Sequence, residues 1–125
     1  MKKLIEEIKQ TVEKEYGRAG DSFGLSNNSD HESFAVILEE IEESRDELNM
    51  FCEKLTDFWQ MVKHNAPDNE KYVQLKSMET TAILAACEFV QVCAMCKKAA
   101  ITVCDRGAVN EFFLQETEYE NIHRD

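Results

Sequence analysis

Apolar side chains recur at alternating steps of three and four residues between residues 34 and 62, and this spacing constrains the fold more than any other feature. Side chains at such a spacing share one face of an α-helix. The sequence therefore predicts a helix over about residues 31–63, with an apolar stripe that packs against neighbouring helices. Arg45 falls inside the stripe, which consists of Phe34, Leu38, Ile41, Leu48, Cys52, Leu55, Trp59 and Val62.

Turn-forming residues separate this helix from two others. Ser29 and Glu32 form a capping-box pattern at its start, and Asp30 is a competing N-cap. A turn over residues 64–69 holds the single proline, and apolar positions on more than one face then predict a second long helix over about residues 69–104. A shorter amphipathic helix is predicted over residues 2–16, ended by Gly17 and followed by a loop over residues 17–30.

Together these patterns predict an all-α helical bundle. Two long antiparallel helices form its centre, with shorter helices at the N- and C-termini, and residues 108–125 form either the last helix or a docking segment. One proline and four glycines in 125 residues fit long regular elements, and the length fits one domain over residues 1–125.

Composition excludes several classes of function. A net charge of −11 argues against nucleic-acid binding, which needs a cationic surface. The sequence shows no signal-peptide core and no apolar window that approaches the length of a membrane span, so a cytoplasmic protein without a membrane partner is expected. The five cysteines are expected to be buried, reduced thiols that pack as small apolar residues.

An acidic run within the first long helix points to metal chemistry. Three of its carboxylates, on Glu40, Glu43 and Glu47, fall within a band of about 60° beside the apolar stripe, where they would face a crevice between helices. Mg²⁺ and Ca²⁺ take carboxylate oxygens as ligands. The alternative is a solvated helix face. The run crowds six carboxylates into nine residues: Glu39, Glu40, Glu42, Glu43, Asp46 and Glu47.

Glu88 is the outlier of the second long helix, because the stretch from Ala82 to Ala94 is otherwise uncharged. A lone buried carboxylate costs several kcal/mol unless it is paired, protonated or bound to a metal. An ion pair with Arg45 or a hydrogen bond to Gln91 would also satisfy it. If Glu88 converges with Glu40 and Glu43, the three would hold Mg²⁺, and a glutamate could accept a proton from water. Lys98 lies on the same side of the helix and is the first candidate for binding phosphate.

Two segments resemble a known family. Residues 29–43 (SDHESFAVILEEIEE) resemble the first motif helix of MazG-like proteins, which belong to the all-α nucleoside triphosphate pyrophosphohydrolases. Residues 88–99 (EFVQVCAMCKKA) look like the second motif helix of a phage- and prokaryote-associated branch. The family's Glu-Glu-x-x-Glu element matches Glu39, Glu40 and Glu43. In its Glu-x-x-Asp element Glu88 is present, and Gln91 stands where aspartate is expected.

The resemblance implies hydrolysis of a nucleoside triphosphate or deoxynucleoside triphosphate to the monophosphate and pyrophosphate. It implies Mg²⁺ as cofactor and assembly into a homodimer or homotetramer. The expected metal ligands are Glu39, Glu40, Glu43 and Glu88. Glu40 and Glu43 are the expected catalytic residues, and Lys98, Gln91 and Arg45 would contact the substrate. The alternative function is a noncatalytic helical bundle that senses nucleotides or binds another protein.

Overall fold

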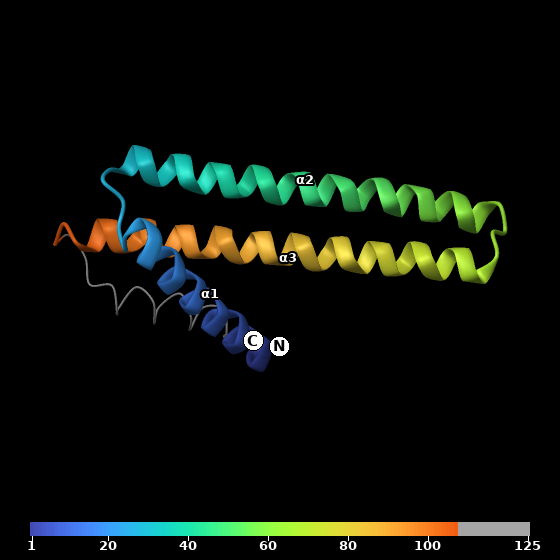
Figure 1. Ribbon diagram of the computed structural model, residues 1–125, viewed down its shortest axis with the longest axis horizontal. Coiled ribbons are helices and arrows are strands. Elements are labelled where there is room, and N and C mark those ends of the chain that lie inside the picture. Colours follow the sequence, from blue (N-terminus) through green and yellow to red (C-terminus); the bar gives the residue numbers. More distant parts are fainter. Residues whose placement is uncertain (108–125) are drawn as a thin grey trace. The chain divides into compact units, whose positions relative to one another are not determined.

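The computed structural model describes residues 1–107, which form three helices and no strand. Helix α1 spans Lys2–Phe23, α2 spans Asp30–Lys63 and α3 spans Asp68–Cys104 (Figure 1). The predicted all-α class is confirmed, and the predicted bounds of the two long helices agree to within a residue. The predicted C-terminal helix lies outside the described residues.

Contacts group the chain into two compact units. The terminal unit consists of residues 1–38 together with the chain from Val90 onward, and the hairpin unit consists of residues 39–89. Both long helices therefore contribute to both units. The single domain expected from the chain length stays a prediction.

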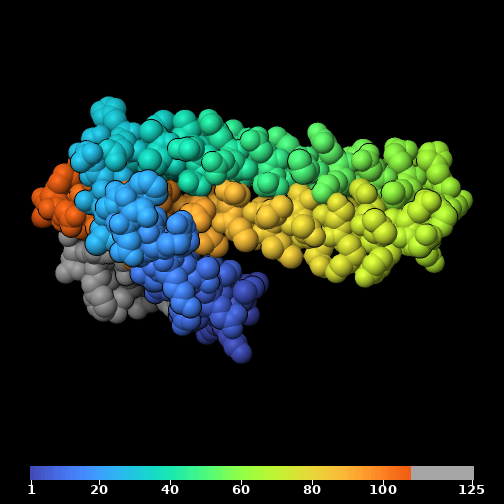
Figure 2. Space-filling view, in the orientation of Figure 1, coloured from blue at the N-terminus to red at the C-terminus, as the bar shows by residue number. Residues whose placement is uncertain are grey.

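In the hairpin unit the later part of α2 runs antiparallel to the earlier part of α3, and their side chains meet along the hairpin (Figures 1 and 2). A short turn over residues 64–67 reverses the chain. Asn65 adopts a φ of 54°, a left-handed conformation that asparagine tolerates better than most residues. Pro67 precedes the first residue of α3, and its carbonyl accepts hydrogen bonds from the backbone N–H groups of Glu70 and Lys71, both at 3.1 Å.

Polar groups occupy much of the contact between the two helices of this hairpin. Lys54 Nζ donates to Thr81 Oγ1 at 2.7 Å, and Gln74 Nε2 donates to the Lys54 carbonyl at 2.8 Å. Ser44, Met78 and Thr81 are the residues of the hairpin unit that are buried. Because directional hydrogen bonds cross the hairpin, they fix the register of one helix against the other.

Among the described residues, the predicted apolar stripe of α2 is largely exposed. Leu48, Leu55 and Trp59 are about half exposed, at 55%, 48% and 56%, and Phe34 is 69% exposed. The stripe therefore makes little contact with the described part of α3, and its packing against another helix stays a prediction. A second stripe with the same spacing passes through Ser44 and Lys54 and faces α3 instead. Periodicity alone does not decide which of two such stripes meets a neighbour.

Helix α3 carries exposed apolar residues as well, including Tyr72, Ile83 and Leu84. It is the one helix of the described chain with the length and apolar composition of a membrane span, and only a small part of that stretch is buried. The expectation that no window approaches such a span is therefore corrected for α3, although Glu88 interrupts the stretch.

In the terminal unit α1 continues through Gly17 and ends at Phe23, so the predicted stop at Gly17 is wrong. One glycine inside a helix costs only about 1 kcal/mol relative to alanine, which the rest of the helix outweighs. Gly24, with a φ of 88°, ends α1, and its N–H donates to the Gly20 carbonyl at 2.8 Å. The Leu25 side chain packs so closely on Gly20 that it would have to shift if Gly20 carried a Cβ.

Polar contacts hold the helices of the terminal unit together. Tyr16 Oη donates to the Leu25 carbonyl at 2.6 Å, which closes the loop after α1. Lys97 of α3 forms a 2.8 Å ion pair with Glu13 of α1, and its Nζ lies 5.4 Å from the centre of the Tyr16 ring. An ion pair between Asp30 and Arg106, at 2.6 Å, places the first residue of α2 beside the end of α3.

The cysteines are free thiols, but their predicted burial is largely wrong. Cys52, Cys87 and Cys96 are exposed, and Cys93 and Cys104 are intermediate. Partial burial raises the pKa of the Cys93 and Cys96 thiols above the ordinary value. These two thiols are therefore less reactive as nucleophiles than an ordinary cysteine.

Candidate metal centre

Three carboxylates converge in the hairpin unit. Glu40 and Glu43 come from α2 and Glu88 from α3, and each offers one oxygen that lies within 4.8 Å of the other two. Glu40 and Glu88 are half-buried, whereas Glu43 is exposed. The structure thus brings together the residues that were expected to share one crevice.

The register of the hairpin explains this convergence. Lys54 bonds to Thr81 across the hairpin. Seven residues make almost two helical turns, so Glu47 shares a face with Lys54 and Glu88 shares a face with Thr81. The helices are antiparallel. Going back from Lys54 to Glu47 on α2 and forward from Thr81 to Glu88 on α3 therefore moves the same distance in the same direction along the hairpin. Glu88 therefore lies level with Glu47, the last residue of the acidic run, and close to Glu43 and Glu47.

The charges in this cluster are not neutralised. Burial raises the pKa of Glu40 above its ordinary value, and the neighbouring charges of Glu43, Glu88 and Glu39 raise it further. Burial also raises the pKa of Glu88, as do a hydrogen bond with Glu43 and the charges of Glu43 and Glu47. No lysine or arginine of the described chain forms an ion pair with Glu40, Glu43 or Glu88.

The donor set suits a hard divalent cation. Oxygen ligands about 2.1 Å from an octahedral Mg²⁺ lie about 3 Å apart when adjacent and about 4 Å apart when opposite. The spacing of the three oxygens, up to 4.8 Å, approaches these values, so small side-chain rotations would complete the geometry. Three protein oxygens would leave positions for water and phosphate oxygens. A cation would also remove the repulsion that raises the pKa values of Glu40 and Glu88.

Other predicted site residues lie outside this group. Glu39 is exposed, and its oxygens are not among the three that converge. Arg45 is exposed and forms no ion pair within the described part of the chain, so its pairing with Glu88 does not occur. The metal role of Glu39 and the substrate role of Arg45 stay predictions.

Gln91 and Lys98 belong to the terminal unit. Gln91 is half-buried and hydrogen-bonds to Glu15 of α1, which helps Arg18 to lower the pKa of Glu15. Lys98 is buried, with 7% of its surface exposed. The expectation that both contact substrate stays a prediction.

Sequence reasoning missed a buried polar cluster at the start of α2, formed by Asn27, Ser33 and Thr102. The sequence predicts only a loop over residues 17–30, which includes Asn27, and a helix over about residues 69–104, which includes Thr102. The one available signal in the sequence was Thr102, a polar residue on the otherwise apolar end of α3. Its partner in the loop, Asn27, is 75 residues away in sequence.

No protein-family model, curated protein or solved structure matches this chain. Functional conclusions therefore rest on the geometry of its own residues and on the resemblance of the two helical segments.

Proposed function

We propose that this protein is a Mg²⁺-dependent nucleoside triphosphate pyrophosphohydrolase of the MazG-like kind. The observation that carries the proposal is the convergence of Glu40, Glu43 and Glu88 from two helices, without a cationic partner within the described residues. The two segments that resemble the family's motif helices are also the ones that supply these carboxylates.

Each carboxylate has a proposed role. Glu40, Glu43 and Glu88 would hold Mg²⁺, with Glu39 at the edge of the site. When bound, the ion would supply positive charge to phosphate oxygens and acidify a water molecule. Glu40 is the proposed proton acceptor, because a raised pKa brings a carboxylate closer to the optimum for general-base catalysis near neutral pH. Glu43 lies beside Glu88 and would serve with Glu40 as a catalytic carboxylate of the site.

In the proposed reaction, water adds across the bond between the α- and β-phosphates. The hydroxyl ends on one phosphorus, the bridging oxygen leaves with the other, and the released proton passes to a carboxylate. Lys98, Gln91 and Arg45 are the proposed substrate contacts, since cationic and amide donors bind phosphate oxygens. The products would be a nucleoside monophosphate and pyrophosphate.

We further propose a homodimer or homotetramer in the cytoplasm. Leu48, Leu55 and Trp59 of α2, and Ile83 and Leu84 of α3, leave the hairpin unit with apolar side chains in water. Monomeric proteins rarely leave extended apolar surfaces uncovered. The hairpin unit of a second copy of the chain would offer the same apolar side chains to cover this surface. A net charge of −11 disfavours the anionic surface of a membrane as the covering partner.

A nucleotide panel with Mg²⁺ tests the catalytic proposal. Purified protein should release pyrophosphate from at least one nucleoside or deoxynucleoside triphosphate, and chelation of the metal should stop the release. If no nucleotide yields pyrophosphate at high protein concentration, the catalytic claim is wrong.

A noncatalytic nucleotide sensor is the second candidate. It is favoured by Gln91, which stands where the family has aspartate and is bonded to Glu15. Calorimetry followed by chromatography separates the two candidates. A nucleotide that binds and is recovered unchanged supports the sensor, whereas conversion to the monophosphate supports the enzyme.

A further inference from the structure

A row of polar side chains runs along the contact between the two helices of the hairpin unit. Its members recur at intervals of seven residues on each helix, so those of one helix share one face. Thr81 is buried and the other five are half-buried. The row, here called the polar seam, consists of Glu40, Glu47 and Lys54 on α2 and of Gln74, Thr81 and Glu88 on α3. The seam therefore joins the carboxylates of the candidate metal centre to a lysine nearer the turn.

The ammonium of Lys54 is only partly satisfied within the seam. Lys54 Nζ donates to Thr81 Oγ1 at 2.7 Å, and the Thr81 hydroxyl donates its own hydrogen to the Ser77 carbonyl at 3.1 Å. Lys54 forms no ion pair with any residue of the described chain. An ammonium has three N–H donors, so an anion could bind to the other two without breaking the bond to Thr81.

The other basic residues of the hairpin unit are engaged elsewhere or lie on another face. Lys71 and Lys76 each form an ion pair with an acidic residue three positions away, at 3.0 Å and 2.8 Å. Lys63 Nζ lies 5.7 Å from the centre of an aromatic ring. Arg45 falls in the exposed apolar stripe of α2 and not in the seam. Lys54 is therefore the cation that shares a face with the carboxylates.

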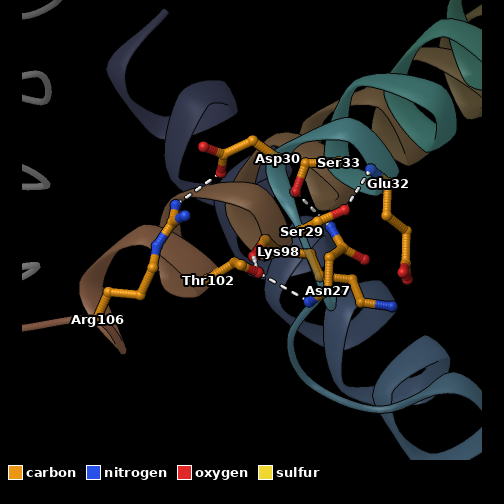
Figure 3. A network of polar contacts seen from close by, with 8 residues as sticks. All are labelled: Asn27, Ser29, Asp30, Glu32, Ser33, Lys98, Thr102 and Arg106. Carbon is orange, nitrogen blue, oxygen red and sulfur yellow. Dashed lines mark hydrogen bonds and ion pairs between the residues drawn. The ribbon is translucent and has the colours of Figure 1, made fainter.

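The lysine that was first expected to bind phosphate lies in the other unit. Lys98 belongs to the terminal unit, where it lies beside Asn27 and Thr102 at the start of α2 (Figure 3). Lys54 belongs to the same unit as the three converging carboxylates. Its place relative to them follows from the register of one hairpin.

Lys54 lies at a distance from the carboxylates that suits a chain of phosphates. Two helical turns separate it from Glu47, which is about 10 Å along the helix axis, and Glu88 lies level with Glu47. A diphosphate or triphosphate spans such a distance when one of its phosphates binds a cation among the carboxylates. A single phosphate is too short to contact both.

We infer that Lys54 binds the β- and γ-phosphates of the nucleotide, while the α-phosphate lies at the cation held by Glu40, Glu43 and Glu88. This inference rests on the proposed metal site and gives the substrate a direction within it. The phosphates run along the polar seam toward the turn, and the nucleoside points the other way. Charge-assisted hydrogen bonds from Lys54 thereby hold the group that leaves as pyrophosphate.

The test is calorimetric titration of the full chain with inorganic pyrophosphate in the presence of Mg²⁺. Lys54→Gln should weaken pyrophosphate by about tenfold or more, because the amide can replace the donor to Thr81 but brings no charge. Lys76→Gln is the matched control, since it makes the same change at an exposed lysine that is paired with Glu79. Its affinity should stay within about twofold of the unaltered chain.

A further variant separates binding from a structural role of Lys54. Thr81→Val removes the acceptor in the seam but leaves the lysine charge, so it should lower the melting temperature and keep the pyrophosphate affinity within about twofold. If Lys54→Gln does not fold, the unaltered chain answers the question. Pyrophosphate with Mg²⁺ should protect Lys54, but not Lys76, from an amine-acylating reagent, as measured by mass spectrometry.

Mn²⁺ binding, followed by electron paramagnetic resonance, distinguishes failure of this inference from failure of the metal site. If the unaltered chain binds Mn²⁺ but not pyrophosphate, or if Lys54→Gln binds pyrophosphate as well as Lys76→Gln does, the role of Lys54 is wrong and the metal site stands. Equal losses of affinity in Lys54→Gln and Thr81→Val would also overturn the role. If the unaltered chain binds neither Mn²⁺ nor pyrophosphate, both proposals are wrong.

Discussion

Three carboxylates of the terminal unit have basic partners that the carboxylate cluster of the hairpin unit lacks, although the hairpin unit also holds the ion pairs Asp68–Lys71 and Glu79–Lys76. In the terminal unit, Glu13, Glu15 and Asp30 each have a basic partner. In the hairpin unit, Glu40, Glu43 and Glu88 converge without one among the described residues. Paired charges are a common feature of stable surfaces. Converging like charges lower stability, so this difference supports the proposal that the hairpin carboxylates bind a ligand of opposite charge.

The largest effect should follow from changing the carboxylates. Glu40→Gln and Glu43→Gln each remove a metal ligand and should lower the rate of pyrophosphate release at least about a hundredfold. Glu42→Gln is the matched control, because Glu42 is an exposed member of the same acidic run that does not join the cluster. Steady-state kinetics check this prediction. Equal losses in all three variants would refute the site.

A second effect concerns the exposed apolar stripe of the hairpin unit. Leu55→Asp should at least halve the mass measured by light scattering, because it places a charge in a surface that a second copy would bury. Gln60→Asp, on an exposed position outside the stripe, should leave the mass unchanged. A monomeric mass for the unaltered chain at micromolar concentration would contradict the proposed oligomer.

The third prediction uses stability without catalysis. Two carboxylates about 4 Å apart repel by about 1 kcal/mol in a water-like dielectric. Glu88→Gln should therefore raise the melting temperature of the metal-free protein at neutral pH by about 4 °C. The same variant should lose the stabilisation that Mg²⁺ gives to the unaltered chain. Calorimetric scans with and without Mg²⁺ measure both effects, and a lower melting temperature in metal-free Glu88→Gln would count against repulsion.

The pH dependence of this effect follows from the raised pKa values of Glu40 and Glu88. The pKa values of these two carboxyl groups are higher in the folded state than in the unfolded state, so folding favours their protonated forms. The stability that this gives is fully present at pH values below the unfolded pKa. It is lost as the pH rises through the folded pKa. The stabilisation by Mg²⁺ should grow over that same interval, because the ion competes with protons. Melting scans of the metal-free and Mg²⁺-loaded protein across this pH range would show it.

The smallest effect belongs to a paired carboxylate of the terminal unit. Arg106 lowers the pKa of Asp30, so this pair contributes stability above the ordinary aspartate pKa and loses it as the pH falls through the lowered value. Asp30→Asn should lower the melting temperature at neutral pH by no more than about 2 °C, since the pair is exposed. Scans at neutral and acid pH check this, and the deficit should vanish in acid.

Local chemistry made the long helices predictable. The Ser29 cap, the single proline at residue 67 and the uninterrupted periodicity fix the bounds of α2 and α3. The convergence of these carboxylates was also predicted. Charged side chains are rare on otherwise apolar helix faces, so those of two neighbouring helices are expected to lie together. Helical spacing alone therefore identified Glu88 as a candidate site residue, without knowledge of the tertiary structure.

Tertiary choices were not predictable in the same way. The chain places the stripe through Ser44 and Lys54 against α3, where Lys54 hydrogen-bonds to Thr81 and Gln74 to the Lys54 carbonyl. Gly17 stays helical because continued packing outweighs its backbone entropy. The Asn27 cluster depends on a contact between a loop and the end of α3, which no local pattern encodes.

One structure determination tests the metal site most directly. The full chain would be crystallised with Mn²⁺, which takes the same hard oxygen ligands as Mg²⁺, and with a nonhydrolysable nucleoside triphosphate. We expect an anomalous density peak at bonding distance from carboxylate oxygens of Glu40, Glu43 and Glu88. Nucleotide bound elsewhere, with no manganese among these three carboxylates, would contradict the proposed function.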